Sequence, residues 1–261
     1  IIGRKHEIEE LERLYDSDRP EFVAIYGRRR VGKTFLIKQA LKGRFTFQHT
    51  GVSPVDQKDE RNRMKTQLES FYFSLLNHGL EGYQQPKSWM EAFFQLIQLL
   101  QSQDRGQRMV IFLDELPWMD TPRSRFLSAF ESFWNGWCSG HDNIMLIVCG
   151  SATSWILSNL SRNKGGLYGR LTCQIKLSPF TLKECEEYFD HENIEMSRYD
   201  ILQTYMVFGG LPYYLSYFRK GYSFEKNTDM ILFVAKPRLN DEFNRLFNAI
   251  FTNAEDCKKV I

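Results

Sequence analysis

Gly27-Arg28-Arg29-Arg30-Val31-Gly32-Lys33-Thr34 is the stretch that decides the fold of this chain. It fits the pattern G-x-x-x-x-G-K-[ST], which is typical of loops that hold nucleotide phosphates. An apolar, β-prone run lies before it at 21–26, and a run with helical character follows at 35–42. The order strand, loop, helix is the setting that the motif requires, and it disfavours the simpler interpretation of a Gly-Lys turn ahead of a helix.

Each residue type in this loop has a physical role. Gly27 and Gly32 permit backbone angles closed to other residues, so that main-chain N–H groups can turn inward around phosphate oxygens. The helix N-terminus adds partial positive charge. Lys33 is expected to reach the β- and γ-phosphates, and Thr34 to ligate Mg²⁺. The triplet Arg28–Arg30 is interpreted as a solvated charge cluster, with contact to the nucleotide or to a partner subunit as the alternative.

Length and composition limit the class of protein. A chain of 261 residues forms one large domain or two modest ones. The hydrophobic fraction of 43% supports a substantial core. The formal net charge of +2 gives no overall basic character of the kind expected for nucleic-acid binding, although basic residues cluster locally.

Cysteine usage and hydropathy indicate a cytoplasmic protein. The five cysteines include no C-x-x-C pair, so we interpret them as reduced core thiols. No apolar run reaches the roughly 18 residues of a membrane span, and no signal peptide is expected. Because the chain starts at Ile1 without Met and stops at Ile261 within a helix-like stretch, we expect it to be part of a longer protein.

Strand-like and helix-like segments alternate through most of the chain. Besides the first strand, strands are predicted at 45–50, 109–114, 143–149 and 172–177. Helices are predicted between them, one starting at Thr121-Pro122 and one over 153–160. The pattern after the last strand is helical throughout and starts with a capping box, Thr181 with Glu184. It predicts a parallel α/β domain at 1–178 and a smaller helical domain after it.

Asp114 and Glu115 end the third predicted strand. Ligands of open α/β sheets bind at the carboxyl ends of the strands, so both carboxylates are expected to point toward the phosphate loop. Asp114 would hold Mg²⁺ through its water shell, and Glu115 would orient and deprotonate the attacking water. The alternative is that this pair caps a turn before Pro117.

Two further positions are candidates on weaker grounds. Ser151 follows the fourth predicted strand and would hydrogen-bond the γ-phosphate or the attacking water, or else cap the helix at 153–160. Arg170 follows a glycine-rich loop and is a candidate for stabilising transition-state charge, in cis or from a neighbour, with Arg162 as the fallback. A solvated loop arginine is the alternative for Arg170.

Several motifs fall in an order that resembles a known family, the archaeal-type ATPases among the AAA+/STAND-like P-loop proteins. They are Gly3-Arg4, the loop from Tyr26 to Thr34, Leu113-Asp114-Glu115, Cys149-Gly150-Ser151, Tyr168-Gly169-Arg170 and Gly209-Gly210-Leu211-Pro212-Tyr213. The phosphate loop alone is unspecific, whereas the ordered set spans nearly the whole chain.

The resemblance implies a five-stranded sheet in the order 5-1-4-3-2 and a helical lid whose Pro212 packs on the base. It implies that Ile2, Gly3 and Arg4 lie near the adenine and that Ser151 is the sensor-1 position. No separate sensor-2 arginine is found in the lid, so lid closure is expected to run through Pro212. Family members usually carry a further winged-helix or nuclease-like domain at the C-terminus. The resemblance therefore implies a helical lid domain at 179–235 and a helical lead at 236–261 into a C-terminal domain that is not present.

Three functions are weighed. The first is an ATP-hydrolysing switch that uses Mg²⁺, exchanges ATP for ADP and signals to a C-terminal effector or DNA-binding domain, with nucleotide-dependent oligomers as a further expectation. The second is an ATP-holding module that grips protein or DNA with negligible turnover, and the third is a small-molecule kinase. Glu115 favours turnover. A GTPase is disfavoured because Asn163-Lys164-Gly165-Gly166 lacks the aspartate of an N-K-x-D motif.

The complete set of predicted site residues follows from these arguments. The catalytic candidates are Lys33, Glu115, Ser151 and Arg170, and the metal ligands are Thr34 and Asp114. The nucleotide-binding candidates are Ile2, Gly3, Arg4, Gly27, Arg28, Arg30, Val31, Gly32, Lys33, Thr34, Phe35 and Pro212.

Overall fold

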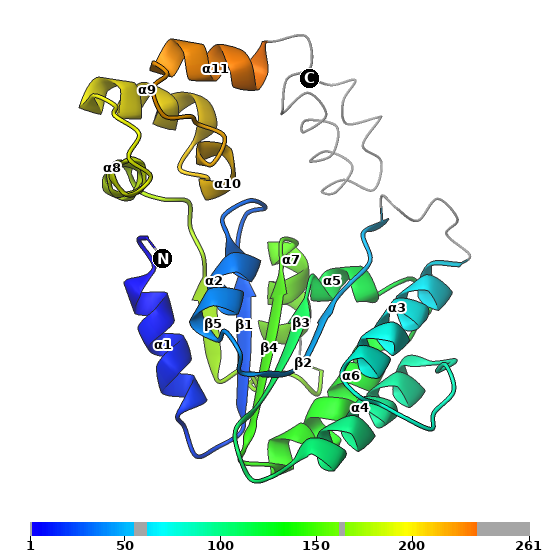
Figure 1. Ribbon diagram of the computed structural model, residues 1–261. Coiled ribbons are helices and arrows are strands. Elements are labelled where there is room, and N and C mark those ends of the chain that lie inside the picture. Colours follow the sequence, from blue (N-terminus) through cyan, green and yellow to red (C-terminus); the bar gives the residue numbers. More distant parts are fainter. Residues whose placement is uncertain (1, 55–61, 162–164, 234–261) are drawn as a thin grey trace. The chain divides into compact units, whose positions relative to one another are not determined.

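A parallel five-stranded sheet forms the centre of the computed structural model, which describes residues 2–54, 62–161 and 165–233 (Figure 1). Its strands run in the order β2-β3-β4-β1-β5. Every neighbouring pair is parallel. The strands are β1 (Glu21–Tyr26), β2 (Phe45–Thr50), β3 (Met109–Asp114), β4 (Ile144–Gly150) and β5 (Cys173–Lys176). The predicted order 5-1-4-3-2 is confirmed.

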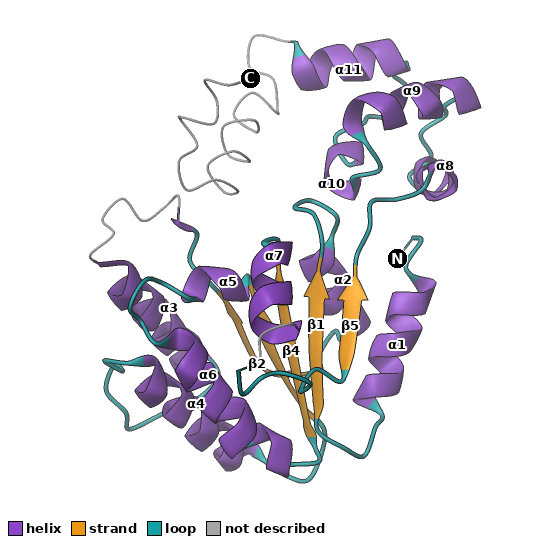
Figure 2. Cartoon of the chain, turned by 180° about the vertical axis from the view of Figure 1, so that it is seen from behind, coloured by secondary structure: helices purple, strands orange, loops and turns teal. Residues whose placement is uncertain are grey.

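The central strands are buried on both faces, which explains their continuous apolar sequences. Phe22 and Ala24 belong to the large apolar cluster, whereas Val23 and Ile25 point the other way and are equally inaccessible to solvent. Helices α3 (Arg63–Asn77), α4 (Trp89–Gln103) and α6 (Phe126–Gly136) pack together and supply aromatic rings to that cluster. Figure 2 shows them as one group beside the strands.

Other helices and turns precede the first strand or connect the strands. They are α1 (Lys5–Tyr15), α2 (Lys33–Ala40), α5 (Leu116–Met119), the 3₁₀ turn η3 (Cys138–Gly140), α7 (Thr153–Ile156) and the π-helical turn η4 (Leu157–Ser161). After β5 the chain is helical: α8 (Leu182–His191), α9 (Arg198–Phe208), α10 (Pro212–Leu215) and α11 (Phe224–Leu232). None of the helices in the described ranges is both long and apolar enough to cross a bilayer.

The chain divides into two compact units. The sheet unit comprises His6–Gly27 and Lys33–Leu177. The helical unit comprises the residues up to Lys5, Arg28–Gly32 and everything from Ser178 onward. The tip of the phosphate loop therefore groups with the C-terminal helices, while its two ends group with the sheet. The domain bounds predicted from the sequence remain predictions, and the segment 236–261 lies outside the described residues.

The predicted helix start at Thr121-Pro122 is wrong. Helix α6 begins only at Phe126, because Arg123 and Arg125 take left-handed backbone angles that interrupt a helix. The Thr121 hydroxyl is buried without a hydrogen-bond partner in the described structure, so it caps nothing. Ser124 instead accepts a hydrogen bond from the Phe126 N–H at 3.3 Å.

The other helix boundaries fit local chemistry. The N-terminus of α8 carries the full capping box predicted at Thr181 and Glu184. Ser88 accepts from the Glu91 N–H, but the Glu91 carboxylate bonds the N–H of Lys87 rather than that of Ser88. Helix α5 is not predicted from the sequence, because Pro117 resembles a helix breaker although proline fits the first turn of a helix.

Candidate functional site

The carboxyl edge of the sheet collects most of the predicted site residues. Because the strands are parallel and in register, Tyr26 lies opposite Gly150, and Thr50 lies opposite Asp114. The segments that follow β1, β3 and β4 therefore start at the same edge, as required for ligand binding in open α/β sheets. Asp114 is the last residue of β3, and Gly27, Glu115 and Ser151 belong to the segments that follow the strands.

The ends of the phosphate loop are fixed by close backbone contacts. Gly27 has φ +152°, and a Cβ there would lie 2.2 Å from the carbonyl oxygen of Leu177. Only glycine fits this close approach. Lys33 is 6% exposed, and its ammonium donates to the Gly27 carbonyl at 3.0 Å. The lysine charge is thus held inside the turn where a phosphate is expected.

Thr34 and Asp114 meet directly, although 80 residues separate them. The Thr34 hydroxyl donates to Asp114 Oδ2 at 2.9 Å. The other carboxylate oxygen, Oδ1, accepts from the Glu115 N–H at 3.0 Å and from the Cys149 thiol at 2.6 Å. Burial, together with the adjacent Asp114 carboxylate, raises the pKa of Cys149 well above its usual value, so this group stays a thiol and can donate.

Glu115 is held in an unusual backbone conformation. Its φ and ψ are both +47°, in the left-handed region that few residues other than glycine adopt. Its Oε2 accepts from both the main-chain N–H and the hydroxyl of Ser151, each at 3.1 Å. Burial, the largest cause, raises the pKa of Glu115 above its usual value, although these two hydrogen bonds oppose the shift.

The capping alternatives do not hold for either residue. The Glu115 side chain makes no capping hydrogen bond to α5. The N-cap of α7 is Ala152, not Ser151, and no side chain caps that end. Both polar groups bond each other instead, at the edge of the sheet where the phosphate loop ends.

Neighbouring contacts fix the segment that follows Glu115. The amide of the fully buried Gln67 donates to the carbonyls of Val52 and Trp118 at 2.8 and 2.9 Å. Asp120 accepts from the Trp155 indole N–H at 3.0 Å, which links the end of α5 to α7. Strained backbone persists where surrounding structure over-determines it, and such positions cluster at functional sites.

In the helical unit, Arg4 joins the loop tip to the segment before α8. The Arg4 guanidinium, 6% exposed, donates to the carbonyls of Ser178 at 2.7 Å and of Val31 at 3.5 Å. It also lies 4.9 Å from the ring centre of Phe180. Phe180 in turn bonds the Gly210 carbonyl through its N–H at 2.6 Å. Arg4 thus contacts a phosphate-loop carbonyl, while the predicted proximity of Ile2, Gly3 and Arg4 to adenine stays a prediction.

The side chain of Arg30 contacts an aromatic ring, so the triplet Arg28–Arg30 is not purely solvated. The Arg30 backbone has φ +74°, and its guanidinium lies 3.9 Å from the ring centre of Tyr213, immediately after Pro212. Arg28, in contrast, is exposed. Tyr213 belongs to the motif Gly209–Tyr213, but the sequence indicates no role for it. Stacking between residues 183 positions apart leaves no local sequence pattern.

Arg170 and Phe35 are separate from this set of contacts. Phe35 is 59% exposed at the start of α2. Arg170 is exposed and lies ahead of β5, near Thr172, which bonds the Phe22 carbonyl. The parallel strand β1 then continues for about 16 Å from Phe22 to Gly27 at about 3.3 Å a residue. A cis role for Arg170 at the phosphate loop is therefore not supported by the topology, and Arg162 lies outside the described residues.

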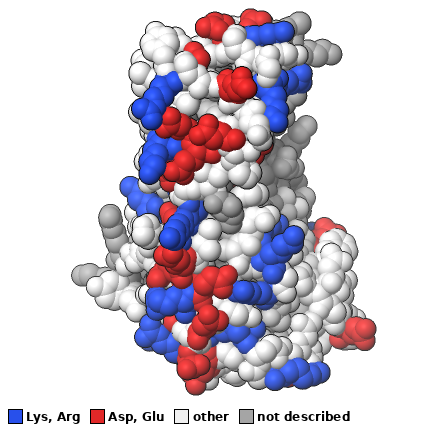
Figure 3. All heavy atoms as spheres, turned by 60° about the vertical axis from the view of Figure 1, so that its left-hand side comes forward, with Lys and Arg blue, Asp and Glu red and all other residues white. Residues whose placement is uncertain are grey.

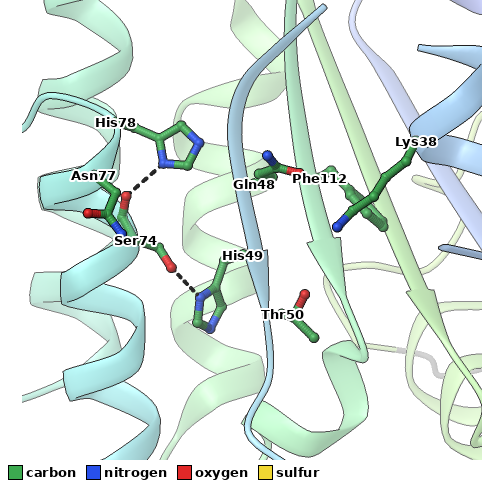
Figure 4. Close-up of a pocket in the computed structure, with 8 residues that line it drawn as sticks. All are labelled: Lys38, Gln48, His49, Thr50, Ser74, Asn77, His78 and Phe112. Atoms are coloured by element: carbon green, nitrogen blue, oxygen red, sulfur yellow. Dashed lines mark hydrogen bonds between the residues drawn. The ribbon is translucent and has the colours of Figure 1, made fainter. Parts of the chain in front are cut away.

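A separate pocket lies at the edge strand β2 (Figure 4). It has a volume of about 480 Å³ and is lined by Lys38, Gln48, His49, Thr50, Ser74, Asn77, His78 and Phe112. His49 is buried, and desolvation together with the nearby His78 lowers its pKa to about 3. It therefore stays neutral and bonds Ser74 at 2.8 Å. None of the predicted site residues lines this pocket.

Charges of both signs are interspersed on the surface beside α1 (Figure 3). Arg13 pairs with Glu10 there, and Arg44 pairs with Glu12. Such a face lacks the single-sign field typical of a nucleic-acid interface. No group of three or more metal-binding side chains of the His, Cys, Asp and Glu type occurs within the described part of the chain.

The parallel sheet in this strand order, with a lysine-bearing loop after β1, defines a P-loop nucleotide-binding ATPase fold. The family described as an ATPase domain predominantly from Archaea matches residues 1–218, and the chain belongs to this family.

A curated sequence relative covers most of this chain. A curated relative is the uncharacterized protein MJECL04 of Methanocaldococcus jannaschii, 28% identical over 215 residues, which are 82% of this chain and 43% of that protein. This chain therefore spans less than half of that relative.

Two solved structures share the fold. The Walker-type ATPase PABY2304 of Pyrococcus abyssi has a TM-score of 0.64 at 20% identity, over 95% of this chain and 76% of that one. The ORC2 protein of Aeropyrum pernix, in its ADPNP-ADP complexes, has a TM-score of 0.57 at 16% identity, over 83% of this chain and 61% of that one.

The residues at the carboxyl edge fit ATP and Mg²⁺ in their chemistry. Thr34 and Asp114 present a hydroxyl and a carboxylate oxygen 2.9 Å apart, and oxygen is the donor that Mg²⁺ prefers. Lys33 supplies a buried positive charge, and the cradle at Gly27 leaves no room for a side chain. Cys149 is not predicted as part of this site from the sequence, where the one signal is its place on a buried strand two residues before Ser151.

Proposed function

We propose that this chain is the ATP-binding and ATP-hydrolysing part of an AAA+/STAND-like switch that uses Mg²⁺ and acts in the cytoplasm. The observation that carries the proposal is the meeting of Lys33, Thr34, Asp114 and Glu115 at one edge of the sheet. Family membership and the nucleotide complexes of the ORC2 protein support nucleotide binding.

Each residue has a role in the proposed reaction. The N–H groups of the loop and the Lys33 ammonium bind the β- and γ-phosphates. Thr34 and Asp114 would hold Mg²⁺, which when bound neutralises phosphate charge. The oxygen of a water attacks the γ-phosphorus, the bond to the ADP oxygen breaks, and Glu115 accepts the water proton. Ser151, which bonds Glu115 in the described structure, orients that carboxylate.

The switch part of the proposal rests on the helical unit. Arg30 at the loop tip stacks on Tyr213, and Arg4 bonds both Val31 and Ser178. A phosphate entering the loop changes the position of these residues, so the contacts to the C-terminal helices change with nucleotide state. A C-terminal effector or DNA-binding domain, or an oligomer of this protein, would respond to that change.

An ATP-holding module with little turnover is the competing function. Glu115 argues against it, because holding a nucleotide requires no second carboxylate. The backbone of Glu115 is strained, and its carboxylate accepts two hydrogen bonds from Ser151, which a holding module would not need. A small-molecule kinase is disfavoured because Asp114-Glu115 and the following helical domain are typical of ATPases with a lid.

Glu115→Gln tests turnover with the least structural change. Phosphate release should fall by about 10²- to 10⁴-fold, the range of general-base contributions, while ATP affinity is retained. Lys33→Ala should instead lose ATP affinity, and Lys38→Ala on the same helix serves as the matched control because Lys38 faces the β2 pocket. Unchanged phosphate release by Glu115→Gln, from a wild-type protein that binds ATP, would favour the holding module.

A further inference from the structure

Two adjacent strands bring a thiol against the candidate magnesium carboxylate. Leu113 of β3 lies opposite Val148 of β4, so the next residues, Asp114 and Cys149, are neighbours at the carboxyl edge. Cys149 is 0% exposed, and its Sγ lies 2.6 Å from Asp114 Oδ1. We propose that Cys149 is a positioning residue that holds the Asp114 carboxylate in the orientation needed for magnesium-dependent ATP binding.

The two oxygens of Asp114 have separate partners. Oδ1 accepts from the Cys149 thiol and from the Glu115 N–H, whereas Oδ2 accepts from the Thr34 hydroxyl. Rotation of the carboxylate would break the contacts on both sides. Two donors on Oδ1 therefore keep Oδ2 directed at Thr34, on the side where the metal would be held.

Packing alone does not account for this cysteine. Leu146 and Val148 of β4 belong to the large apolar cluster, but Cys149 does not, because alternate residues of a strand point to opposite faces. An apolar side chain at this position would leave Oδ1 with the Glu115 N–H as its one donor among the contacts described. A buried acceptor that loses a donor is costly, so the carboxylate would turn to find another.

The role in nucleotide chemistry rests on the function proposed above, whereas the thiol–carboxylate contact does not. The first experiment follows the binding of a fluorescent ATP analogue while Mg²⁺ is titrated. Cys149→Ala should raise the Mg²⁺ concentration at half-saturation about three- to tenfold, as expected from the net contribution of one hydrogen bond. Affinity for the analogue without Mg²⁺ should stay the same.

Two variants separate positioning from packing. Cys149→Ser keeps a donor and should require Mg²⁺ within about twofold of the wild-type concentration. Cys138→Ala is the matched control, because Cys138 is an equally buried thiol in η3 and belongs to the apolar cluster. It should lower thermal stability without changing the Mg²⁺ requirement. If Cys149→Ala and Cys138→Ala leave the Mg²⁺ requirement equally unchanged, the inference is overturned.

A spectroscopic measurement tests the contact in the nucleotide-free protein. The infrared S–H stretching band of Cys149, obtained as the difference between wild type and Cys149→Ser, should lie at the low frequency of a strongly bonded thiol. Asp114→Asn should shift it upward, because an amide oxygen is a weaker acceptor than a carboxylate. A band unmoved by Asp114→Asn would contradict the contact. A shifted band in a protein without magnesium-dependent ATP binding would support the contact and refute the proposed function.

Discussion

Asp114 in the sheet unit and Arg30 in the helical unit are held by different kinds of contact. In the sheet unit, Asp114 is 4% exposed and accepts three hydrogen bonds from three different segments. In the helical unit, Arg30 is half-buried and rests on the face of the Tyr213 ring. Buried hydrogen bonds are strengthened by the low local dielectric, whereas a partly exposed cation–π contact is weak.

This difference matches the tasks proposed for the two units. Hydrolysis needs groups held in one geometry, and the sheet unit provides it through a buried network at the ends of β3 and β4. A switch needs contacts that a ligand can exchange at low cost, and the stacking of Arg30 on Tyr213 is of that kind. The phosphate loop contributes residues to both units.

The largest effects are expected from alanine substitutions at two glycines, Gly27 in the sheet unit and Gly210 in the helical unit. A Cβ at Gly27 would lie 2.2 Å from the Leu177 carbonyl oxygen, and one at Gly210 would lie 1.9 Å from that of Phe180. Each alanine substitution should destabilise its own unit by on the order of 1–3 kcal/mol through overpacking. Amide hydrogen exchange should show Gly27→Ala loosening β1 and β5, and Gly210→Ala loosening α8 and α10.

ATP affinity then separates the two glycine variants. Gly27→Ala should weaken ATP binding at least about tenfold, because it displaces the carbonyl that positions Lys33. Gly136→Ala is the control, since a Cβ there meets nothing within 4 Å. Equal loosening of both units by either variant would show that they unfold together, contrary to the division described here.

The pH dependence of hydrolysis tests whether Glu115 of the sheet unit acts as the base. A base acts only when deprotonated, and burial raises the pKa of Glu115 above its usual value of 4.5. The rate should therefore rise by up to about tenfold per pH unit until the pH passes that raised pKa, and then level off. Ser151→Ala removes a hydrogen bond that lowers this pKa, so the profile should move to higher pH.

The raised pKa of Glu115 also makes the free energy of unfolding depend on pH. Because the folded state binds the Glu115 proton more tightly than the unfolded chain does, Glu115 contributes most to stability below pH 4.5. Its contribution falls as the pH rises from 4.5 through the raised pKa. Denaturant unfolding of wild type and Glu115→Gln across this range measures the effect, and curves that stay parallel would contradict it.

Removal of the Arg30 stacking contact should have the smallest effect. Arg30→Met keeps the length of the side chain but not the charge, and a partly exposed cation–π contact contributes about 0.5–1 kcal/mol. The nucleotide dependence of hydrogen exchange in α10 should therefore change about two- to fivefold, with hydrolysis rates retained. Arg28→Met at the exposed neighbouring position is the control. A large loss of hydrolysis in Arg30→Met would place Arg30 in the catalytic machinery instead.

Local sequence predicted the parts of the molecule that depend on local chemistry. The phosphate loop, the five strands and the capping box at Thr181 are each encoded within a few adjacent residues. The strand order came from the resemblance to a family rather than from the residues alone. The start of α6 is not predicted correctly, because Arg123 and Arg125 adopt left-handed backbone angles that arginine rarely takes.

In the candidate site, too, local sequence predicts the motif residues but not the contacts between residues that are distant in the chain. Local sequence predicts Thr34, Asp114 and Glu115 as site residues because each belongs to a short motif. Cys149 and Tyr213 were not assigned roles, because their partners lie 35 and 183 residues away, and only the folded chain brings them together. The position of Arg170 likewise depends on the direction of β5, which no single residue reveals.

The parallel course of β1 and β5 has a kinetic consequence. Arg170 precedes β5 and lies near the amino end of β1, whereas the phosphate loop follows the carboxyl end of β1. If Arg170 serves the phosphates at all, it serves those of a second molecule. Specific activity would then decline on dilution, and mixing Arg170→Ala with Glu115→Gln would restore turnover that neither protein has by itself.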